Sequence, residues 1–179
     1  GRNLAQLLGV TFYDGDAVGE CARQRHLPVS IVNDLKGASE VPYFMMKYPL
    51  GNGPSDVQYH LFQMQREIVQ RMADQGPCVF VGRCADYILE NRENHVSIFI
   101  YAPLERRVQV CMERFGMDEK TARNMTITVD RARQAYHMTY ARYLPHDIHH
   151  KDLLINSQNL GAEKTAYLLR DMVQMKLGI

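Results

Sequence analysis

The stretch PCVFVGRCADYIL, from Pro77 to Leu89, constrains the fold more than any other part of the chain. Its residues 78–81 are apolar or small without alternation, which predicts a strand covered on both faces, as in a parallel sheet with helices on either side. Ligands of such sheets bind beyond the carboxyl ends of the strands. Gly82 and Arg83 follow at once, so we expect a turn that carries a guanidinium to this edge. That guanidinium suits a phosphate or carboxylate of a ligand, and it equally suits a structural ion pair.

The rest of the chain alternates helices with short strands, which predicts an α/β fold with right-handed crossovers and a parallel sheet. We expect helices over about 2–8, 16–26, 55–76, 84–91, 103–115, 118–143 and 162–176, and strands ending at Asp14 and over 78–82, 96–101 and 153–156. The long helix from residue 55 carries an apolar face of Leu61, Met64, Ile68 and Met72. Segment 27–55 is rich in proline and glycine and predicts an irregular, mobile insertion.

Composition narrows the class of protein. A chain of 179 residues predicts one domain, 1–179, with an insertion. The net charge of +1 gives no electrostatic reason to expect nucleic acid or an anionic membrane as a partner. No apolar run is long enough to span a bilayer, and no secretory signal is visible. The four cysteines show no CxxC spacing, and we expect two of them, Cys78 and Cys84, to be small buried hydrophobes in a cytoplasmic protein.

Three strand ends carry candidate site residues. Asp14 and Arg83 end two strands, and Arg106 follows the Ala102-Pro103 turn after a third. In a parallel sheet these ends converge on one edge, where arginines from several strands would suit a polyanionic ligand. The alternative is that they are ordinary surface arginines in salt bridges.

Two further segments contain chemically suggestive residues. TVDRARQAYHMTYAR places Asp130, Arg131 and Arg133 on a polar helix, which is typical either of a solvated, salt-bridged helix or of arginines that neutralise a transferring phosphoryl group. The segment PHDIHHKD, residues 145–152, offers metal-ligand types, but it lacks helical i, i+4 histidine spacing. We interpret it as a solvated loop and predict no metal site there.

Five segments, in order, resemble the cytidylate kinase-like family of P-loop nucleoside monophosphate kinases. GRNLAQLLGVTFYD is similar to the family's phosphate-loop ending, GSGGR, followed by LAxxLGxxFYD, and VFVGRCADYIL is similar to VIVGRGADYIL. The segments IFIYAPLERRVQ, DRARQAYH (family DxxRxxYY) and DLLINSQNLG (family DLxINTxxLG) follow at plausible spacings. The resemblance covers nearly the whole chain.

The resemblance implies a P-loop NTPase-type fold that transfers the γ-phosphoryl group of ATP, with Mg²⁺, to a nucleoside monophosphate, typically CMP or dCMP. By motif, the resemblance implies that the phosphate loop is closed by Gly1 and Arg2, and that the acceptor is held by Asp14, Arg83 and Arg106. It further implies that Arg131 and Arg133 act catalytically from a lid at 118–143. The acceptor-binding insertion would be 27–55. Closure of such a lid excludes water, so that phosphate passes to the acceptor.

Two departures from the family pattern qualify these expectations. Related kinases follow the aspartate at position 14 with Ser/Thr-Gly-Ala and an arginine five residues on, whereas here Gly15–Val18 follow and the arginine is Arg23, so the acceptor base stays open. The first strand and most of the phosphate loop are absent before Gly1, and the chain as given is expected to bind ATP phosphates poorly.

We expect the gene to encode this strand and loop upstream, as about five apolar residues and a Gly/Ser-rich turn that complete the sheet between the strands at 78–82 and 96–101. A catalytically silent nucleotide-binding or scaffold module of the same fold is the alternative function.

Overall fold

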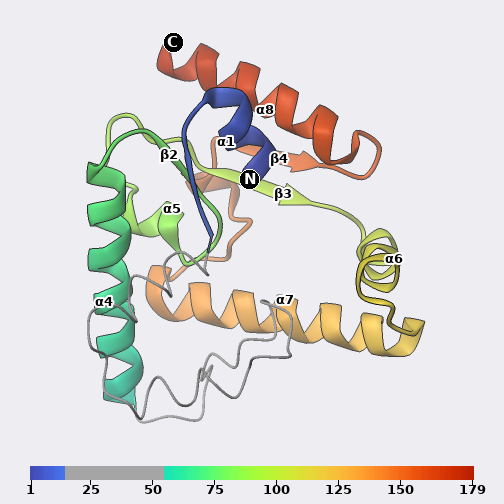
Figure 1. The fold of residues 1–179 in the computed structure, drawn as a ribbon. Helices are drawn as coiled ribbons and strands as arrows, with labels where there is room; N and C mark the ends of the chain where they lie inside the picture. The colour runs from blue at the N-terminus through green and yellow to red at the C-terminus, as the bar shows by residue number, and fades with distance from the viewer. Residues whose placement is uncertain (15–54) are drawn as a thin grey trace. The chain divides into compact units, whose positions relative to one another are not determined.

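The computed structural model describes residues 1–14 and 55–179, which are drawn in colour in Figure 1. These residues belong to two compact units, Gly1–His95 and Val96–Ile179. The predicted helix at 16–26 and nearly all of the predicted insertion at 27–55 lie outside the described residues. The single domain over 1–179 therefore stays a prediction.

In its described residues, the first unit pairs two parallel strands with three helices. In chain order its elements are α1 (Arg2–Leu8), β1 (Thr11–Tyr13), α4 (Ser55–Asp74), β2 (Cys78–Phe80) and α5 (Ala85–Ile88). Strand β1 pairs with β2 in the register Thr11↔Cys78 to Tyr13↔Phe80. Helix α1 has the predicted bounds because Gly9 adopts the left-handed conformation, φ 67°, that commonly ends a helix.

Helix α5 is much shorter than the predicted helix at 84–91. Cys84 has a left-handed backbone, φ 53° and ψ 29°, so no right-handed helix can include it. Leu89, with φ −106° and ψ 8°, ends the helix after four residues. The sequence pattern identified the helix but overestimated its length.

Helix α4 buries one face against the first unit's core. The buried side chains of that face are Phe62, Gln65, Ile68, Val69 and Met72. Their spacing of three and four residues is that of an amphipathic helix. The prediction is confirmed for Ile68 and Met72, whereas Met64 is only half-buried and the side chain of Leu61 lies outside the described part.

The second unit has the same pairing of parallel strands with helices. Its elements are β3 (Ile98–Tyr101), α6 (Leu104–Phe115), α7 (Glu119–Ala141), the 3₁₀ helix η2 (Ile148–His150), β4 (Leu153–Asn156) and α8 (Gly161–Leu177). Strand β3 pairs with β4 from Ile98↔Leu153 to Tyr101↔Asn156. The predicted strand at 153–156 and the Asp118 cap of α7 are confirmed; the Asp118 carboxylate accepts a hydrogen bond from the Thr121 N–H at 3.0 Å.

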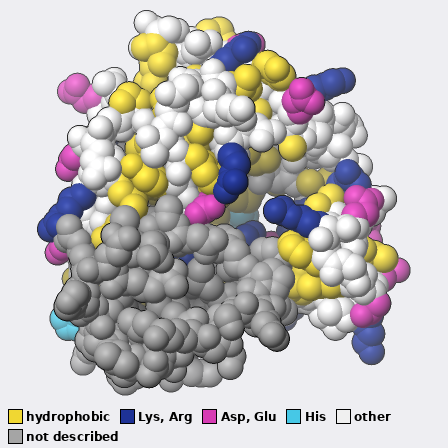
Figure 2. All heavy atoms as spheres, viewed as in Figure 1, with side chains coloured by type: hydrophobic (Ala, Val, Ile, Leu, Met, Phe, Trp, Pro, Cys, Tyr) yellow, Lys and Arg dark blue, Asp and Glu magenta, His cyan; other side chains and the backbone are white. Residues whose placement is uncertain are grey.

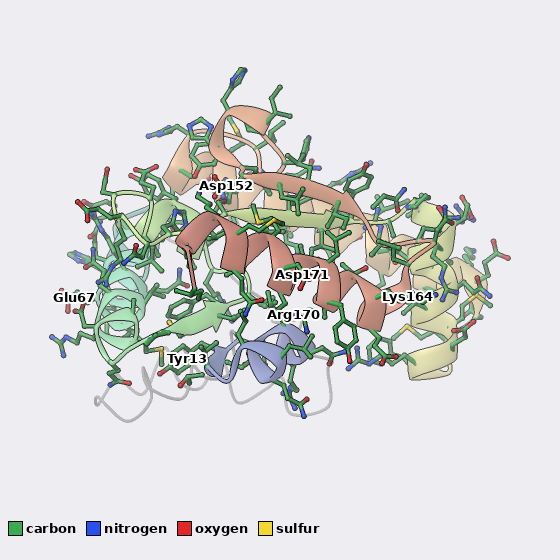
Figure 3. The ribbon with its side chains drawn as sticks, turned by 90° about the horizontal axis from the view of Figure 1, so that it is seen from above. Tyr13, Glu67, Asp152, Lys164, Arg170 and Asp171 are labelled. Carbon is green, nitrogen blue, oxygen red and sulfur yellow. The ribbon has the colours of Figure 1, made fainter. Side chains whose placement is uncertain are left out.

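Two predicted boundaries in this unit were wrong, one because of the local backbone and one because of a residue distant in sequence. Pro103 precedes α6 as its N-cap, with extended ψ of 149°, rather than occupying its first turn. Strand β3 starts at Ile98 instead of Val96, because the Ser97 N–H donates to the Asp152 carboxylate at 2.8 Å. Asp152, labelled in Figure 3, also pairs with Lys176 of α8 at 2.5 Å. One carboxylate thus joins the start of both strands to the last helix.

The described residues confirm an α/β fold with short parallel sheets flanked by helices, in two pairs, β1-β2 and β3-β4. The predicted cover on both strand faces is wrong, since β2 is half-buried and Val81, Ile100 and Tyr101 are more than 40 % exposed. A two-stranded sheet leaves one edge of each strand unpaired, which accounts for this exposure. Among the described residues, no helix is both long and apolar enough to cross a membrane.

Candidate functional site

The carboxyl ends of β1 and β2 form the first part of the candidate site. The strands are parallel, and the Val81 N–H donates to the Tyr13 carbonyl at 2.9 Å, so both strands end at the same edge. Asp14 follows β1 here, and Gly82 and Arg83 follow β2. The sequence prediction that these strand ends meet therefore holds within the first unit.

Arg2 and Gly1 lie at the start of α1, near the same strands. The Arg2 guanidinium is 3.9 Å from the Asp14 carboxylate and 5.4 Å from the centre of the Phe12 ring. The Arg2 side chain is 79 % exposed, so this contact contributes little to stability and leaves the cation accessible. A Cβ at Gly1 would lie 2.4 Å from Cγ2 of Val81, so only glycine fits this approach.

The backbone at Arg83 is unusual. Gly82, Arg83 and Cys84 have successive positive φ angles of 75°, 62° and 53°. The Ala85 N–H donates to the Gly82 carbonyl at 3.1 Å and closes this turn. The Gln65 side-chain amide donates to the Arg83 carbonyl at 2.8 Å. Cys84 stands where the family motif has glycine, and its left-handed backbone is the conformation that glycine adopts without strain.

The two cysteines of this region differ in burial. Cys84 is 3 % exposed, as predicted, and Cys78 of β2 is half-buried. Burial raises the pKa of the Cys78 thiol, which keeps it in the neutral form at physiological pH. The Cys78 thiol is therefore not activated as a nucleophile by a lowered pKa.

In the second unit, the side chain of Arg107 is more constrained than that of its neighbour Arg106. Among the described residues, Arg106 forms polar contacts within its own helix only, at Gln109 (3.1 Å) and Glu113 (4.0 Å). Arg107 Nε donates to the Ala102 carbonyl at 2.9 Å, and its Nη1 donates to Asp130 of α7 at 2.5 Å. Arg107 therefore holds the end of β3 against α7, a role that the sequence analysis missed.

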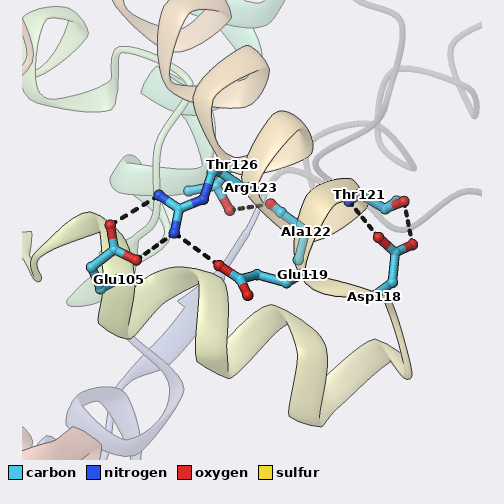
Figure 4. Close-up of polar contacts among 7 residues, drawn as sticks. All are labelled: Glu105, Asp118, Glu119, Thr121, Ala122, Arg123 and Thr126. Atoms are coloured by element: carbon cyan, nitrogen blue, oxygen red, sulfur yellow. Dashed lines mark hydrogen bonds and ion pairs between the residues drawn. The ribbon is translucent and has the colours of Figure 1, made fainter.

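A second ion-pair cluster links α6 with α7, as Figure 4 shows. Arg123 donates to both carboxylate oxygens of Glu105, at 2.9 and 2.5 Å, and to Glu119 at 3.1 Å. The hydrogen bond from Arg123 lowers the pKa of Glu105, while those from the Thr121 hydroxyl and N–H lower that of Asp118. The acceptors belong to α6 (Glu105) and α7 (Glu119), so Arg123 helps to pack these two helices together.

Arg131 and Arg133 lie on α7 and both are exposed. Neither forms an ion pair or hydrogen bond with other residues in the part of the chain that the structure describes. Two residues along a helix correspond to about 200° of rotation, so the two arginines project from different faces of α7. Asp130, the residue before Arg131, accepts a hydrogen bond from Arg107 of α6.

The histidine-containing segment after α7 folds on itself. Asp147 accepts the His149 N–H at 2.9 Å and lies 3.5 Å from His150, whose ring stacks on Tyr143 with centroids 3.7 Å apart. Across residues 1–14 and 55–179, no group of three or more histidine, cysteine, aspartate or glutamate side chains could hold a metal ion. On the face drawn in Figure 2, basic and acidic side chains are interspersed with hydrophobic ones.

Comparison with known proteins agrees with this architecture. The sequence model of the cytidylate kinase-like family matches residues 1–159. A cytidylate kinase of Staphylothermus marinus is 28 % identical over 99 residues, which is 55 % of this chain and 55 % of that protein, so the match spans about half of each. The crystal structure of an uncharacterized protein from Eubacterium ventriosum is 25 % identical and superposes with a TM-score of 0.69, covering 99 % of this chain and 88 % of that one.

These observations define the class first: an α/β protein with short parallel sheets flanked by helices and an arginine in the turn after one strand. Within that class, the chain belongs to the cytidylate kinase-like family, whose sequence model covers most of its length.

Proposed function

We propose that this protein transfers the γ-phosphoryl group of ATP to a nucleoside monophosphate, with CMP or dCMP as the acceptor. The single observation that carries the proposal is the edge of the β1-β2 sheet, where Asp14 follows β1 and Arg83 lies in the turn after β2, in a chain of the cytidylate kinase-like family. Parallel α/β sheets bind their ligands at this edge.

The acceptor phosphate is assigned to Arg83 and Arg106, and Asp14 is assigned to the acceptor nucleoside. A planar guanidinium donates two parallel hydrogen bonds to a phosphate, which suits the acceptor's negative charge. The Arg106 contacts with Gln109 and Glu113 lie along one exposed helix face and are weak, so the side chain is available for a nucleotide.

The transferring phosphoryl group is assigned to Arg131 and Arg133 of α7, and the phosphate loop to Gly1 and Arg2. Because phosphoryl transfer spreads charge over three equatorial oxygens, cations aligned with those oxygens stabilise the transition state. Arg131 and Arg133 are exposed cations that no described carboxylate neutralises, which fits a role in binding an anion.

The described residues fit Mg²⁺ only as a companion of ATP. They contain no cluster of three protein ligands, and Mg²⁺ in such enzymes is held mainly by substrate phosphates and water with one or two protein oxygens. When bound, the ion would neutralise phosphate charge, and the arginines would supply the remaining positive charge.

The proposal is tested by a coupled ATP-consumption assay on the protein expressed from its complete gene, with CMP, dCMP, UMP and AMP as acceptors. We expect turnover with CMP or dCMP, and we expect R83A to raise KM, lower kcat, or both, by about tenfold or more, the effect of losing one charge-assisted contact. The R131A/R133A double variant is expected to lower kcat far more than it raises KM. ATP-independent binding of nucleotide without turnover would instead identify a silent nucleotide-binding module.

A further inference from the structure

The turn after β2 stores backbone strain at Arg83 and Cys84. Within the described residues, the non-glycine positions with positive φ are Arg83, Cys84 and Arg142. Arg142 is the ordinary left-handed cap of α7, whereas the other two are consecutive and occupy the centre of a four-residue turn. Turns with two left-handed central residues normally place Gly, Asn or Asp there, because L side chains destabilise this conformation.

Strained residues persist only where their surroundings hold them in place. Cys84 and Ala85 are buried at 3 % and 6 % exposure, and the Ile88 N–H donates to the Cys84 carbonyl at 2.9 Å. These contacts fix the turn on the side of α5. On the side of Arg83, the Gln65 side-chain amide donates a hydrogen bond to the Arg83 carbonyl oxygen at 2.8 Å.

Gln65 is a polar side chain in an apolar helix face. It is 7 % exposed, and the neighbouring buried residues of that face are Phe62, Ile68 and Val69. A buried amide is destabilising unless it is hydrogen-bonded, so a hydrophobic residue would suit packing alone better here. What a hydrophobic residue cannot do is donate a hydrogen bond to the peptide group that follows Arg83.

We propose that Gln65 is a positioning residue for Arg83. Its amide fixes the plane of the Arg83–Cys84 peptide, keeps the turn left-handed, and so holds the Arg83 guanidinium in the orientation that binds the nucleotide. This inference rests on the proposed function, because it assigns Gln65 a role in nucleotide binding through Arg83. Gln65 itself contacts no substrate.

The test is isothermal titration of CMP into the protein expressed from its complete gene, alongside urea denaturation of each variant. Q65M keeps the size of the side chain and removes the donor, and we expect the Kd for CMP to rise about tenfold, as for the loss of one buried hydrogen bond. Q70M is the matched control. Gln70 lies on the same helix and accepts from Arg92 only through its backbone carbonyl, so the Kd should stay unchanged.

The same Q65M change is then made in a C84G background. Glycine adopts the left-handed conformation freely, so the turn needs less support and the effect of Q65M should shrink to about twofold. A purely structural role in the core would lower stability in both backgrounds without this coupling in Kd. Q65N, which keeps the amide on a shorter side chain, replaces Q65M if the latter does not fold.

Four results would overturn the inference. Unchanged CMP affinity of Q65M beside weakened affinity of R83A would refute the positioning role and leave the proposed function intact. If Q65M lost the same CMP affinity in the unmodified and C84G backgrounds, Gln65 would not act through the turn. A loss of CMP affinity that disappears once all variants are fully folded would show that the role of Gln65 is structural. Absence of nucleoside monophosphate binding by the unmodified protein would overturn the proposed function and this inference together.

Discussion

Arg107 is expected to contribute to stability far more than its neighbour Arg106, and the comparison of R107M with R106M makes this prediction sharp. Both side chains belong to α6 and are about equally exposed, at 36 % and 41 %. Arg107 binds the end of β3 and α7, whereas the polar contacts of Arg106 with described residues all lie within its own helix. Methionine preserves most of the aliphatic stem in both variants, so the difference reports the guanidinium contacts.

The magnitude follows from two contacts of Arg107. A buried hydrogen bond to a charged group contributes about 1.5–3 kcal/mol and an exposed ion pair about 0–1 kcal/mol. Arg107 and Asp130 are about one-third exposed, so we assign about 1 kcal/mol to each contact and about 2 kcal/mol to both. In a chain of this size that corresponds to a fall in Tm of about 4–8 °C. R106M should lower stability by less than about 0.5 kcal/mol.

Urea denaturation with R107M, R106M, D130N and the R107M/D130N pair measures these quantities. We expect D130N to cost about 1 kcal/mol and the cycle to show a coupling of about that size. R106M should instead weaken CMP binding with almost unchanged stability. Equal stability of R107M and the unmodified protein, or a loss in R106M as large as that in R107M, would refute the assignment of the two arginines.

Three further predictions concern the second unit. Ser97 Oγ is buried without a hydrogen-bond partner among the described residues, so S97A should raise the free energy of unfolding by up to about 1 kcal/mol. S157A should lower the free energy of unfolding, because the Ser157 hydroxyl donates to the Tyr101 carbonyl at 3.1 Å. Urea denaturation measures both variants, and an S97A protein less stable than the unmodified protein would contradict the first of these predictions. The lowered pKa of Glu105 implies a stabilising contribution that is present above its ordinary pKa of 4.5 and is lost as the pH falls through the lowered value. Unfolding of E105Q should therefore depend less on pH below about 4.5 than that of the unmodified protein, and parallel pH profiles would exclude the Arg123 contact.

Much of the fold was predictable because it depends on local rules. The left-handed glycine after α1, the Asp118 cap of α7 and the apolar strand at 153–156 each follow from a few adjacent residues. One boundary that failed depends on a distant partner. Strand β3 starts late because Asp152, 55 residues away in sequence, takes the N–H of Ser97.

The site residues divide in the same way. The sequence predicts that Arg83 ends a strand, and the structure adds that its turn is left-handed and held by Gln65. The polar residue within the apolar spacing of α4 was the available signal for Gln65. Nothing in the sequence distinguishes Arg106 from Arg107, because one residue of helix rotation decides which of them faces α7.

Transfer of labelled phosphate tests the central claim most directly. The protein expressed from its complete gene is incubated with Mg²⁺, ATP labelled at the γ-phosphate, and CMP or dCMP, and the products are separated by chromatography. We predict that the label appears in the nucleoside diphosphate, that R83A slows its appearance about tenfold or more, and that little label is released as inorganic phosphate. Label that stays in ATP, or that passes only to water, with every nucleoside monophosphate supplied would contradict the assignment of this protein as a nucleoside monophosphate kinase.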